Sequence, residues 1–315
     1  MTTNRTIELL GAAVGEGAPD SRCRAAPAVL RRWGLARRLG LRGRRARWGP
    51  SVRSDLALLD LGPLAVVSEF SPRLAAAVAA SMGHGRLPIV IGGDHSCAVG
   101  TWSGAAHALR ERGPLGLIWI DAHLDSHTPE TSETQMPHGM PLAALLGHGP
   151  PQLTQVADDQ PKLRPEHLVL IGPRSWEAGE AALLSRLGVR VITSTEVGER
   201  GFRDCIDEAL ARVRDATAGW GLSFDLDALD PADAPGTGTP VELGIRLDEV
   251  AAALHGLAGD ERFVAGELVE YNPALDPQRV TAAAVETLLS AMLADRPPAR
   301  PDRERPALQP GGGAA

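Results

Sequence analysis

Short apolar runs recur along the chain from residue 87 onward, and each run ends in polar or acidic residues. The runs span residues 87–91, 115–120, 167–171, 189–192, 220–224 and 263–269. Uninterrupted apolar runs of this length are typical of strands that are buried on both faces of a parallel sheet. The pattern therefore predicts a sheet that is covered on both sides.

Segments with apolar residues at helical spacing separate these runs. They span residues 98–112, 179–187, 202–216 and 247–257. Parallel strands need crossover connections, and helices of this length supply them. The alternation predicts an α/β fold with an open, doubly wound sheet in a single domain from residue 5 to 293. The Pro- and Gly-rich segment 294–315 predicts a disordered C-terminal tail.

The N-terminal region contains an arginine-rich segment, residues 22–47, with leucines interspersed at helical spacing. This pattern favours a surface helix with a solvated arginine face over a nucleic-acid-binding arm, because few aromatic residues accompany the arginines. The sequence leaves the role of the segment open.

Composition narrows the class of protein further. The 315 residues contain 32 Lys+Arg and 39 Asp+Glu, a net charge of −7, which argues against a nucleic-acid partner. Three cysteines are too few for a disulfide framework, so we expect a reducing cytoplasm. Neither a signal peptide nor an apolar run of roughly 18 residues is apparent, which disfavours a membrane partner.

Ligand-type side chains follow three of the predicted strands. The ends of these strands read Gly-Gly-Asp-His-Ser (92–96), Asp-Ala-His-Leu-Asp (121–125) and Asp-Leu-Asp (225–227). The carboxyl ends of parallel strands meet at one edge of a sheet, where ligands bind. The candidate metal ligands are His95, Asp121, His123, Asp125, Asp225 and Asp227.

Four carboxylates that converge without counter-charge are very unfavourable, and a site for two divalent metal ions resolves this conflict. Mixed carboxylate and imidazole ligands suit Mn²⁺, whereas a structural zinc site normally uses paired cysteines. Each motif alone is also compatible with a turn or a helix cap. Cys97 follows His95 closely, but we interpret it as a small buried packing residue.

The three motifs, in this order, resemble the arginase (ureohydrolase) family. The resemblance extends from Leu10 to the Glu-Tyr-Asn-Pro motif at residues 270–273. It implies a three-layer α/β/α sandwich around a mainly parallel sheet. It also implies a homo-oligomer, a trimer or hexamer, and a small guanidino compound as substrate.

The resemblance further implies that the six residues hold two Mn²⁺ ions, with Asp121 and Asp225 shared between them. Two divalent ions that share a water supply hydroxide near neutral pH, and this hydroxide attacks the guanidinium carbon of L-arginine to give urea and L-ornithine. By the same resemblance, Asp125 orients the hydroxide, His138 delivers a proton to the leaving nitrogen and Glu270 pairs with the guanidinium group.

Two places depart from the arginase pattern, and both lie where the family binds the amino-acid end of its substrate. The matching positions are His127, Ser132, Thr134, Glu177 and Glu180. His127 stands in place of an Asn, and Glu177 in place of an Asp. L-Arginine is therefore the leading candidate, with Nω-hydroxy-L-arginine or another guanidino acid as alternatives and agmatine less favoured. Two other classes, a non-catalytic metal-binding regulator and a single-zinc deacetylase, stay open.

Overall fold

The computed structural model describes residues 5–40 and 45–294, and its centre is one eight-stranded sheet in which all neighbouring strands are parallel. The strand order is β2-β1-β3-β8-β7-β4-β5-β6. The strands are β1 (Ile7–Ala13), β2 (Ala46–Arg53), β3 (Leu87–Ile91), β4 (Leu115–Ile120), β5 (Leu168–Ile171), β6 (Arg190–Ile192), β7 (Gly219–Asp225) and β8 (Phe263–Val269). The predicted α/β fold with a doubly wound sheet is confirmed.

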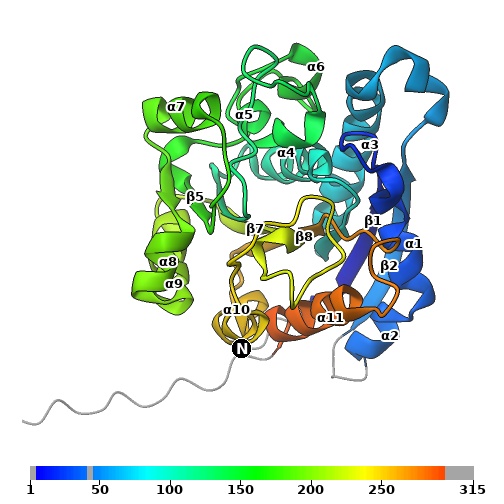
Figure 1. Ribbon diagram of the computed structural model, residues 1–315, viewed down its shortest axis with the longest axis vertical. Coiled ribbons are helices and arrows are strands. Elements are labelled where there is room, and N and C mark those ends of the chain that lie inside the picture. Colours follow the sequence, from blue (N-terminus) through cyan, green and yellow to red (C-terminus); the bar gives the residue numbers. More distant parts are fainter. Residues whose placement is uncertain (1–4, 41–44, 295–315) are drawn as a thin grey trace, which may run out of the picture.

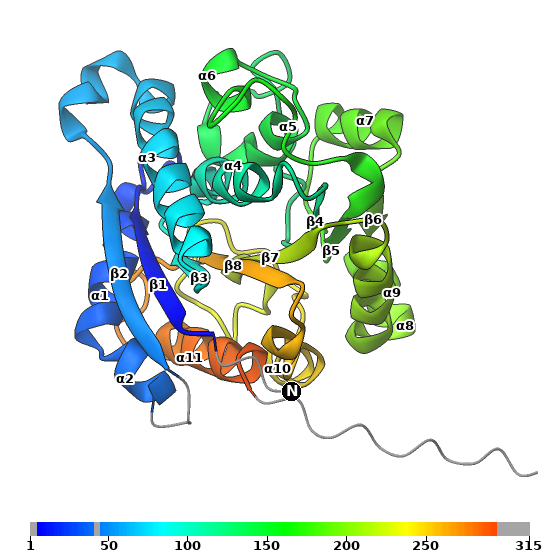
Figure 2. The ribbon, with the colours of Figure 1, turned by 180° about the vertical axis from the view of Figure 1, so that it is seen from behind.

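Helices cover both faces of this sheet, which makes three layers (Figures 1 and 2). One face packs against α1 (Ala26–Arg32), α2 (Leu35–Gly40), α8 (Ser194–Arg200), α9 (Phe202–Arg214), α10 (Leu247–Leu254) and α11 (Val280–Met292). The other packs against α3 (Pro63–Gly83), α4 (Ala98–Leu109), α5 (Pro141–Leu145), α6 (Pro151–Thr154) and α7 (Ala178–Leu187).

The strands alternate between the two cores because successive side chains in a strand point to opposite faces. In β4, for example, Ile118 and Ile120 belong to the core under α9, whereas Leu117 and Trp119 belong to the core under α4. Both sets are buried, so the strand shows a continuous apolar run. This is the physical reason why the runs predicted the sheet.

The expectation of one surface helix in the arginine-rich segment is wrong. The segment forms the short helices α1 and α2, and its last two residues, Ala46 and Arg47, begin the edge strand β2. Gly34, with a φ of 80°, interrupts the helical path between α1 and α2. An edge strand is largely solvated, so β2 carries arginines and no apolar run. Strand β1 was not among the predicted strands either.

Helix α3 is, within the described residues, the one helix long and apolar enough to cross a membrane by length and composition. It is a core helix here, because Val67, Phe70 and Leu74 are buried in the core that α4 shares. The backbones of the two helices approach closely at Gly104, where a Cβ atom would lie 2.3 Å from the carbonyl oxygen of Ala75.

The predicted C-terminal tail falls, from residue 295 onward, outside the described residues.

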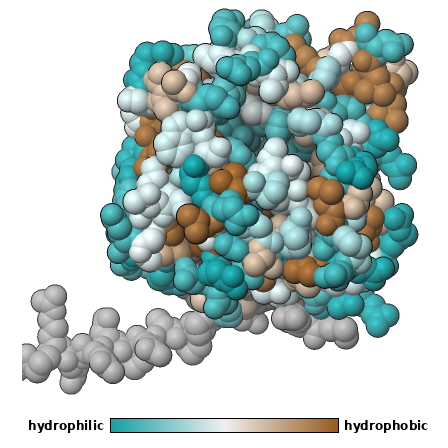
Figure 3. Space-filling view, in the orientation of Figure 1, coloured by the Kyte–Doolittle hydropathy of each residue, from teal (hydrophilic) through white to brown (hydrophobic). Residues whose placement is uncertain are grey.

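The space-filling view shows an apolar patch over the segment that joins β2 to α3 (Figure 3). Leu56, Leu59 and Leu61 form this patch and are 44%, 49% and 72% exposed.

Candidate metal centre

The loop after β3 places His95 at the carboxyl edge of the sheet. The carboxylate of Asp94 accepts a hydrogen bond from the backbone amide of Ser96 at 2.9 Å and so begins the turn that presents His95. The imidazole of His95 stacks on Trp119, with ring centroids 4.2 Å apart. Its Nε2 lies 2.9 Å from Oγ of Ser223. These contacts fix the ring, so Nδ1 faces the loops after β4 and β7.

Three carboxylates converge on Nδ1 of His95. Its distances to carboxylate oxygens are 3.1 Å for Asp121, 3.0 Å for Asp125 and 3.0 Å for Asp225. Nδ1 is buried, yet it makes no hydrogen bond with correct geometry to any residue that the structure describes. A buried nitrogen that faces three oxygens without bonding to them fits a ligand set around a cation.

A second group of ligand-type atoms lies next to the first. Nδ1 of His123 is 3.5 Å from Oδ1 of Asp121 and 3.2 Å from Oδ2 of Asp227. Asp121 thus directs one oxygen to each imidazole and belongs to both groups. Asp225 groups with His95, while its other oxygen accepts the backbone amide of Asp227 at 2.8 Å. All six predicted ligands are therefore brought together, and their role as ligands stays a prediction.

The electrostatics of the two groups favour bound cations. Burial and the charge of Asp121 raise the pKa of Asp125 to about 6, and burial beside Asp227 raises the pKa of Asp225 well above its ordinary value. Burial lowers the pKa of His123, but Asp227 and Asp121 outweigh this effect and raise it to about 12. The clustered carboxylates thus strongly favour positive charge among them, which a bound divalent cation would supply.

Glu270 and His138 lie beside the first group. Oε1 of Glu270 accepts a hydrogen bond from the backbone amide of His95 at 2.8 Å and lies 3.6 Å from Nδ1 of His138. Burial lowers the pKa of His138, but the carboxylate of Glu270 outweighs it, and the pKa rises to about 9. The backbone amide of His138 donates to the carbonyl of Gly17 at 3.0 Å. The structure therefore places a histidine and a carboxylate together next to the predicted ligands.

The predicted substrate-binding residues form a separate group. Nε2 of His127 lies 2.9 Å from Oε2 of Glu177 and 3.4 Å from Oε2 of Glu180. Glu180 is buried and accepts the backbone amide of Glu177 at 3.1 Å, as part of the capping box that begins α7. These three residues are also close enough to hold a cation. Their contact with substrate stays a prediction.

The two predicted hydroxyl residues lie in the loop that precedes His138. Oγ of Ser132 accepts the backbone amide of Gln135 at 3.0 Å, and Oγ1 of Thr134 accepts that of Met136 at 3.3 Å. Both hydroxyls keep their hydrogen as a donor, while their oxygens stabilise the turn. Ser132 is buried and Thr134 is exposed, so the loop does not present them as an equivalent pair.

Sequence reasoning missed the residues that hold His95 in place. Ser223, next to His95 Nε2, donates to Oε1 of Glu267 at 2.6 Å, and Nε1 of Trp102 donates to the same oxygen at 2.5 Å. Glu267 is fully buried in β8. An acidic residue inside an otherwise apolar run was the available signal, because a buried carboxylate needs partners.

The chain is thus an α/β sandwich that carries two carboxylate–imidazole groups at the carboxyl edge of its sheet. These groups are suited to divalent cations, which places the chain among α/β proteins with a site for such cations. Comparison with known proteins gives the family. The model of the arginase family matches residues 5–294. The chain belongs to the arginase family, a family of metal-dependent hydrolases.

Individual relatives agree with this assignment. The chain is 43% identical to an arginase from Bacillus caldovelox over 233 residues, 74% of this chain and 77% of that protein. It is 30% identical to an arginase from Staphylococcus aureus (strain COL), with 94% of this chain and 99% of that protein covered. The crystal structure of an arginase from Bacillus subtilis is similar with a TM-score of 0.84 at 35% identity, and 93% of this chain and 99% of that chain are covered.

Proposed function

We propose that this protein hydrolyses the guanidino group of L-arginine to urea and L-ornithine and that it uses two Mn²⁺ ions. The observation that carries the proposal is the pair of carboxylate–imidazole groups that share Asp121. Relatives named arginase support the substrate.

The two ions would be held by the six predicted ligands. His95, Asp121, Asp125 and Asp225 would hold one, and Asp121, His123, Asp225 and Asp227 the other. The unbonded Nδ1 of His95 and the mixed carboxylate and imidazole donors fit such ions. When bound, two divalent ions lower the pKa of a shared water and make hydroxide available near neutral pH.

The chain's own residues would bind and orient the substrate and move a proton. Glu270 offers a carboxylate to the planar guanidinium group, since the amide of His95 fixes its Oε1. His138 lies 3.6 Å from that oxygen and would hand a proton to the leaving nitrogen, which otherwise departs poorly. Asp125 would accept a hydrogen bond from the attacking oxygen and so orient it.

His127, Glu177 and Glu180 would hold the amino-acid end of the substrate. Glu177 is hydrogen-bonded to His127 and is exposed, so it would offer its carboxylate to an approaching α-ammonium group. Ser132 and Thr134 would donate to the α-carboxylate. An amino acid supplies both groups, which favours L-arginine or Nω-hydroxy-L-arginine over agmatine.

A panel of four compounds tests the proposed substrate. Mn²⁺-loaded protein is incubated with L-arginine, Nω-hydroxy-L-arginine, 4-guanidinobutyrate and agmatine, and the release of urea or hydroxyurea is measured. We expect L-arginine to give the highest kcat/KM. If none of the four gives product, the catalytic proposal fails.

The cellular setting is also a proposal. Cys23, Cys97 and Cys205, all within the described residues, are buried and unpaired, which supports a reducing cytoplasm. On the basis of the family resemblance, we propose that the protein forms a homo-oligomer, a trimer or hexamer. We further propose that residues 5–293 of each chain form one ureohydrolase domain. Sedimentation equilibrium that shows only monomer would refute the oligomer.

A further inference from the structure

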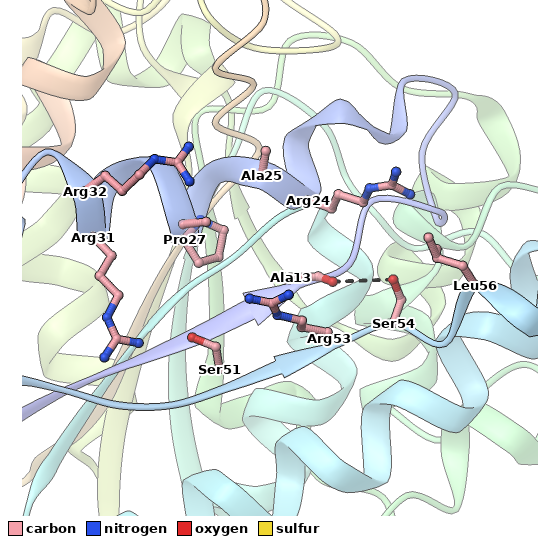
Figure 4. A pocket seen from close by; sticks show the side chains of 11 residues that line it. Ala13, Arg24, Ala25, Pro27, Arg31, Arg32, Ser51, Arg53, Ser54 and Leu56 are labelled. Carbon is pink, nitrogen blue, oxygen red and sulfur yellow. Dashed lines mark hydrogen bonds between the residues drawn. The ribbon is translucent and has the colours of Figure 1, made fainter.

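A cavity of about 530 Å³ lies between helix α1 and strand β2 (Figure 4). None of the residues that line it is a predicted metal ligand or substrate-binding residue. Its polar lining consists of Arg24, Arg31, Arg32, Arg53, Ser51 and Ser54. The cavity is thus lined by four arginines from three elements, the 3₁₀ helix Ser21–Ala25, α1 and β2. The proposed function leaves the role of these arginines unexplained.

Most of this positive charge has no counter-charge. Within residues 5–40 and 45–294, Arg31, Arg32 and Arg53 form no ion pair with a carboxylate. The described cavity lining contains no Asp or Glu. Arg31 instead lies over the ring of Trp48, 5.7 Å from its centroid. Like charges gathered in one cavity repel one another, so a bound anion would stabilise this arrangement. The whole chain carries a net charge of −7, so the cavity is locally opposite in sign.

The fourth arginine of the lining, Arg24, is held in place by a buried carboxylate. Nη1 of Arg24 donates to Oε1 of the buried Glu16 at 2.7 Å. Burial raises the pKa of Glu16, but hydrogen bonds from Ser54 and Arg24 outweigh it and lower the pKa. Oγ of Ser54 also lies 3.4 Å from the carbonyl oxygen of Ala13, so its single hydrogen is shared between Glu16 and this carbonyl (Figure 4). Arg24 is thus held by the buried carboxylate of Glu16, whereas the exposed Arg31 and Arg53 form no ion pair within the described residues and are accessible to a ligand.

We propose that this cavity, the arginine pocket, binds a small organic anion that carries a phosphate or carboxylate group. Guanidinium groups bind both kinds of oxyanion with paired hydrogen bonds, and the hydroxyl of Ser51 adds a neutral donor. Ala13, Pro27 and Leu56 give the pocket an apolar part, which suits an organic body in addition to the charge. The volume lies within the range of small-molecule sites.

Isothermal titration calorimetry on the full-length, metal-loaded protein tests this proposal at constant ionic strength. Glycerol phosphate and malate serve as probes for phosphate and carboxylate, and sodium chloride replaces them in the reference titration. Arg31→Gln and Arg53→Gln remove lining charges, while Arg37→Gln removes an exposed charge from α2 that does not line the pocket. Because Arg31, Arg37 and Arg53 are exposed, circular dichroism should show that all variants fold.

We expect at least one probe to bind, with affinity about tenfold lower in Arg31→Gln and Arg53→Gln and unchanged in Arg37→Gln. The stronger probe identifies the oxyanion. Equal affinity in wild type and Arg53→Gln, or an equal response to chloride, would overturn the proposal. The proposal is also overturned if neither probe binds. A change in sedimentation alone in Arg53→Gln would then assign the pocket as a contact between copies of the chain. Binding is measured without turnover, so failure here is distinct from failure of the proposed hydrolysis.

Discussion

Oε1 of Glu270 accepts a hydrogen bond from the backbone amide of His95 at 2.8 Å, and the same oxygen lies 3.6 Å from Nδ1 of His138. One carboxylate thus joins the loop that carries a predicted metal ligand to the predicted proton donor. Glu270 has a φ of 65°, a left-handed conformation that is rare outside glycine and costs about 1–3 kcal/mol. The fold therefore spends stability to place this carboxylate.

The first prediction concerns the charge of Glu270. In Glu270→Gln, we expect the pKa of His138 in the metal-free protein to fall from about 9 toward its ordinary value of 6.5, because the raising carboxylate is gone while burial still lowers it. NMR titration of the imidazole resonances measures this, with exposed His255 as an internal reference. A pKa of His138 that stays near 9 would show that Glu270 does not control it.

The second prediction concerns metal and stability. Bound Mn²⁺ should raise the free energy of unfolding, because it removes repulsion among the buried carboxylates. We expect a gain of about 2.7 kcal/mol when free metal exceeds its Kd about 100-fold. Asp225→Asn should lose most of this gain. Asp230→Asn, five residues further on, is the matched control, because its Oδ1 only accepts the amide of Ala232. Denaturant unfolding with and without chelator measures both, and equal metal responses in the two variants contradict the ligand assignment.

The third prediction concerns a buried carboxylate at the far end of the sheet. The side chain of Glu8 in β1 is 4% exposed and lies 2.7 Å from Arg47 and 3.0 Å from Arg86. Burial raises the pKa of Glu8, but the hydrogen bonds from the two arginines outweigh this effect and hold the pKa below its ordinary 4.5. Glu8→Gln should cost about 1–3 kcal/mol at pH 7.

The pH dependence of that cost follows from the sign of the shift. A lowered pKa in the folded state stabilises the protein above pH 4.5, and this stabilisation is lost as the pH falls through the lower, folded-state value. The difference between wild type and Glu8→Gln should therefore shrink in acid. Glu69→Gln, in an exposed pair with Arg73, is the control and should change stability by less than about 1 kcal/mol. A pH-independent difference for Glu8→Gln would refute the ion-pair account.

The fourth prediction concerns substrate selection by Glu177. Glu177→Gln keeps the hydrogen bond to His127 within reach but removes the charge offered to an α-ammonium group. We expect KM for L-arginine to rise about tenfold and KM for 4-guanidinobutyrate, which lacks that group, to change little. Glu133→Gln on the neighbouring loop is the control for loss of an exposed charge. Equal changes for both substrates would remove Glu177 from substrate recognition.

The sequence predicted the central strands and the site edge well, because both depend on local pattern. Residues 87–91 and 115–120 are buried on both faces and therefore read as strands. The motifs after them carry His95 and Asp121, which the parallel arrangement brings to one edge. His95 and Asp121 each follow closely after a buried parallel strand, so their positions in the sequence were enough to predict that they lie close together.

Other parts depend on tertiary contacts that no local pattern shows. Strand β2 is an edge strand whose Arg47 pairs with Glu8 of β1, and all its residues are exposed or half-buried, so they do not form an apolar run. The support of His95 by Ser223 and Glu267 joins three strands. The arginine pocket requires residues of α1 and β2 to lie around one cavity, which the helical spacing of the leucines did not predict.

The most direct test of the account joins metal content to turnover in one preparation. Protein reconstituted with Mn²⁺ is assayed for bound metal and for urea and ornithine released from L-arginine, beside Asp125→Asn. The account predicts two manganese ions per wild-type chain, equal amounts of both products, and loss of most activity in the folded variant. A wild-type protein that binds one tightly held zinc ion and releases no urea would contradict it.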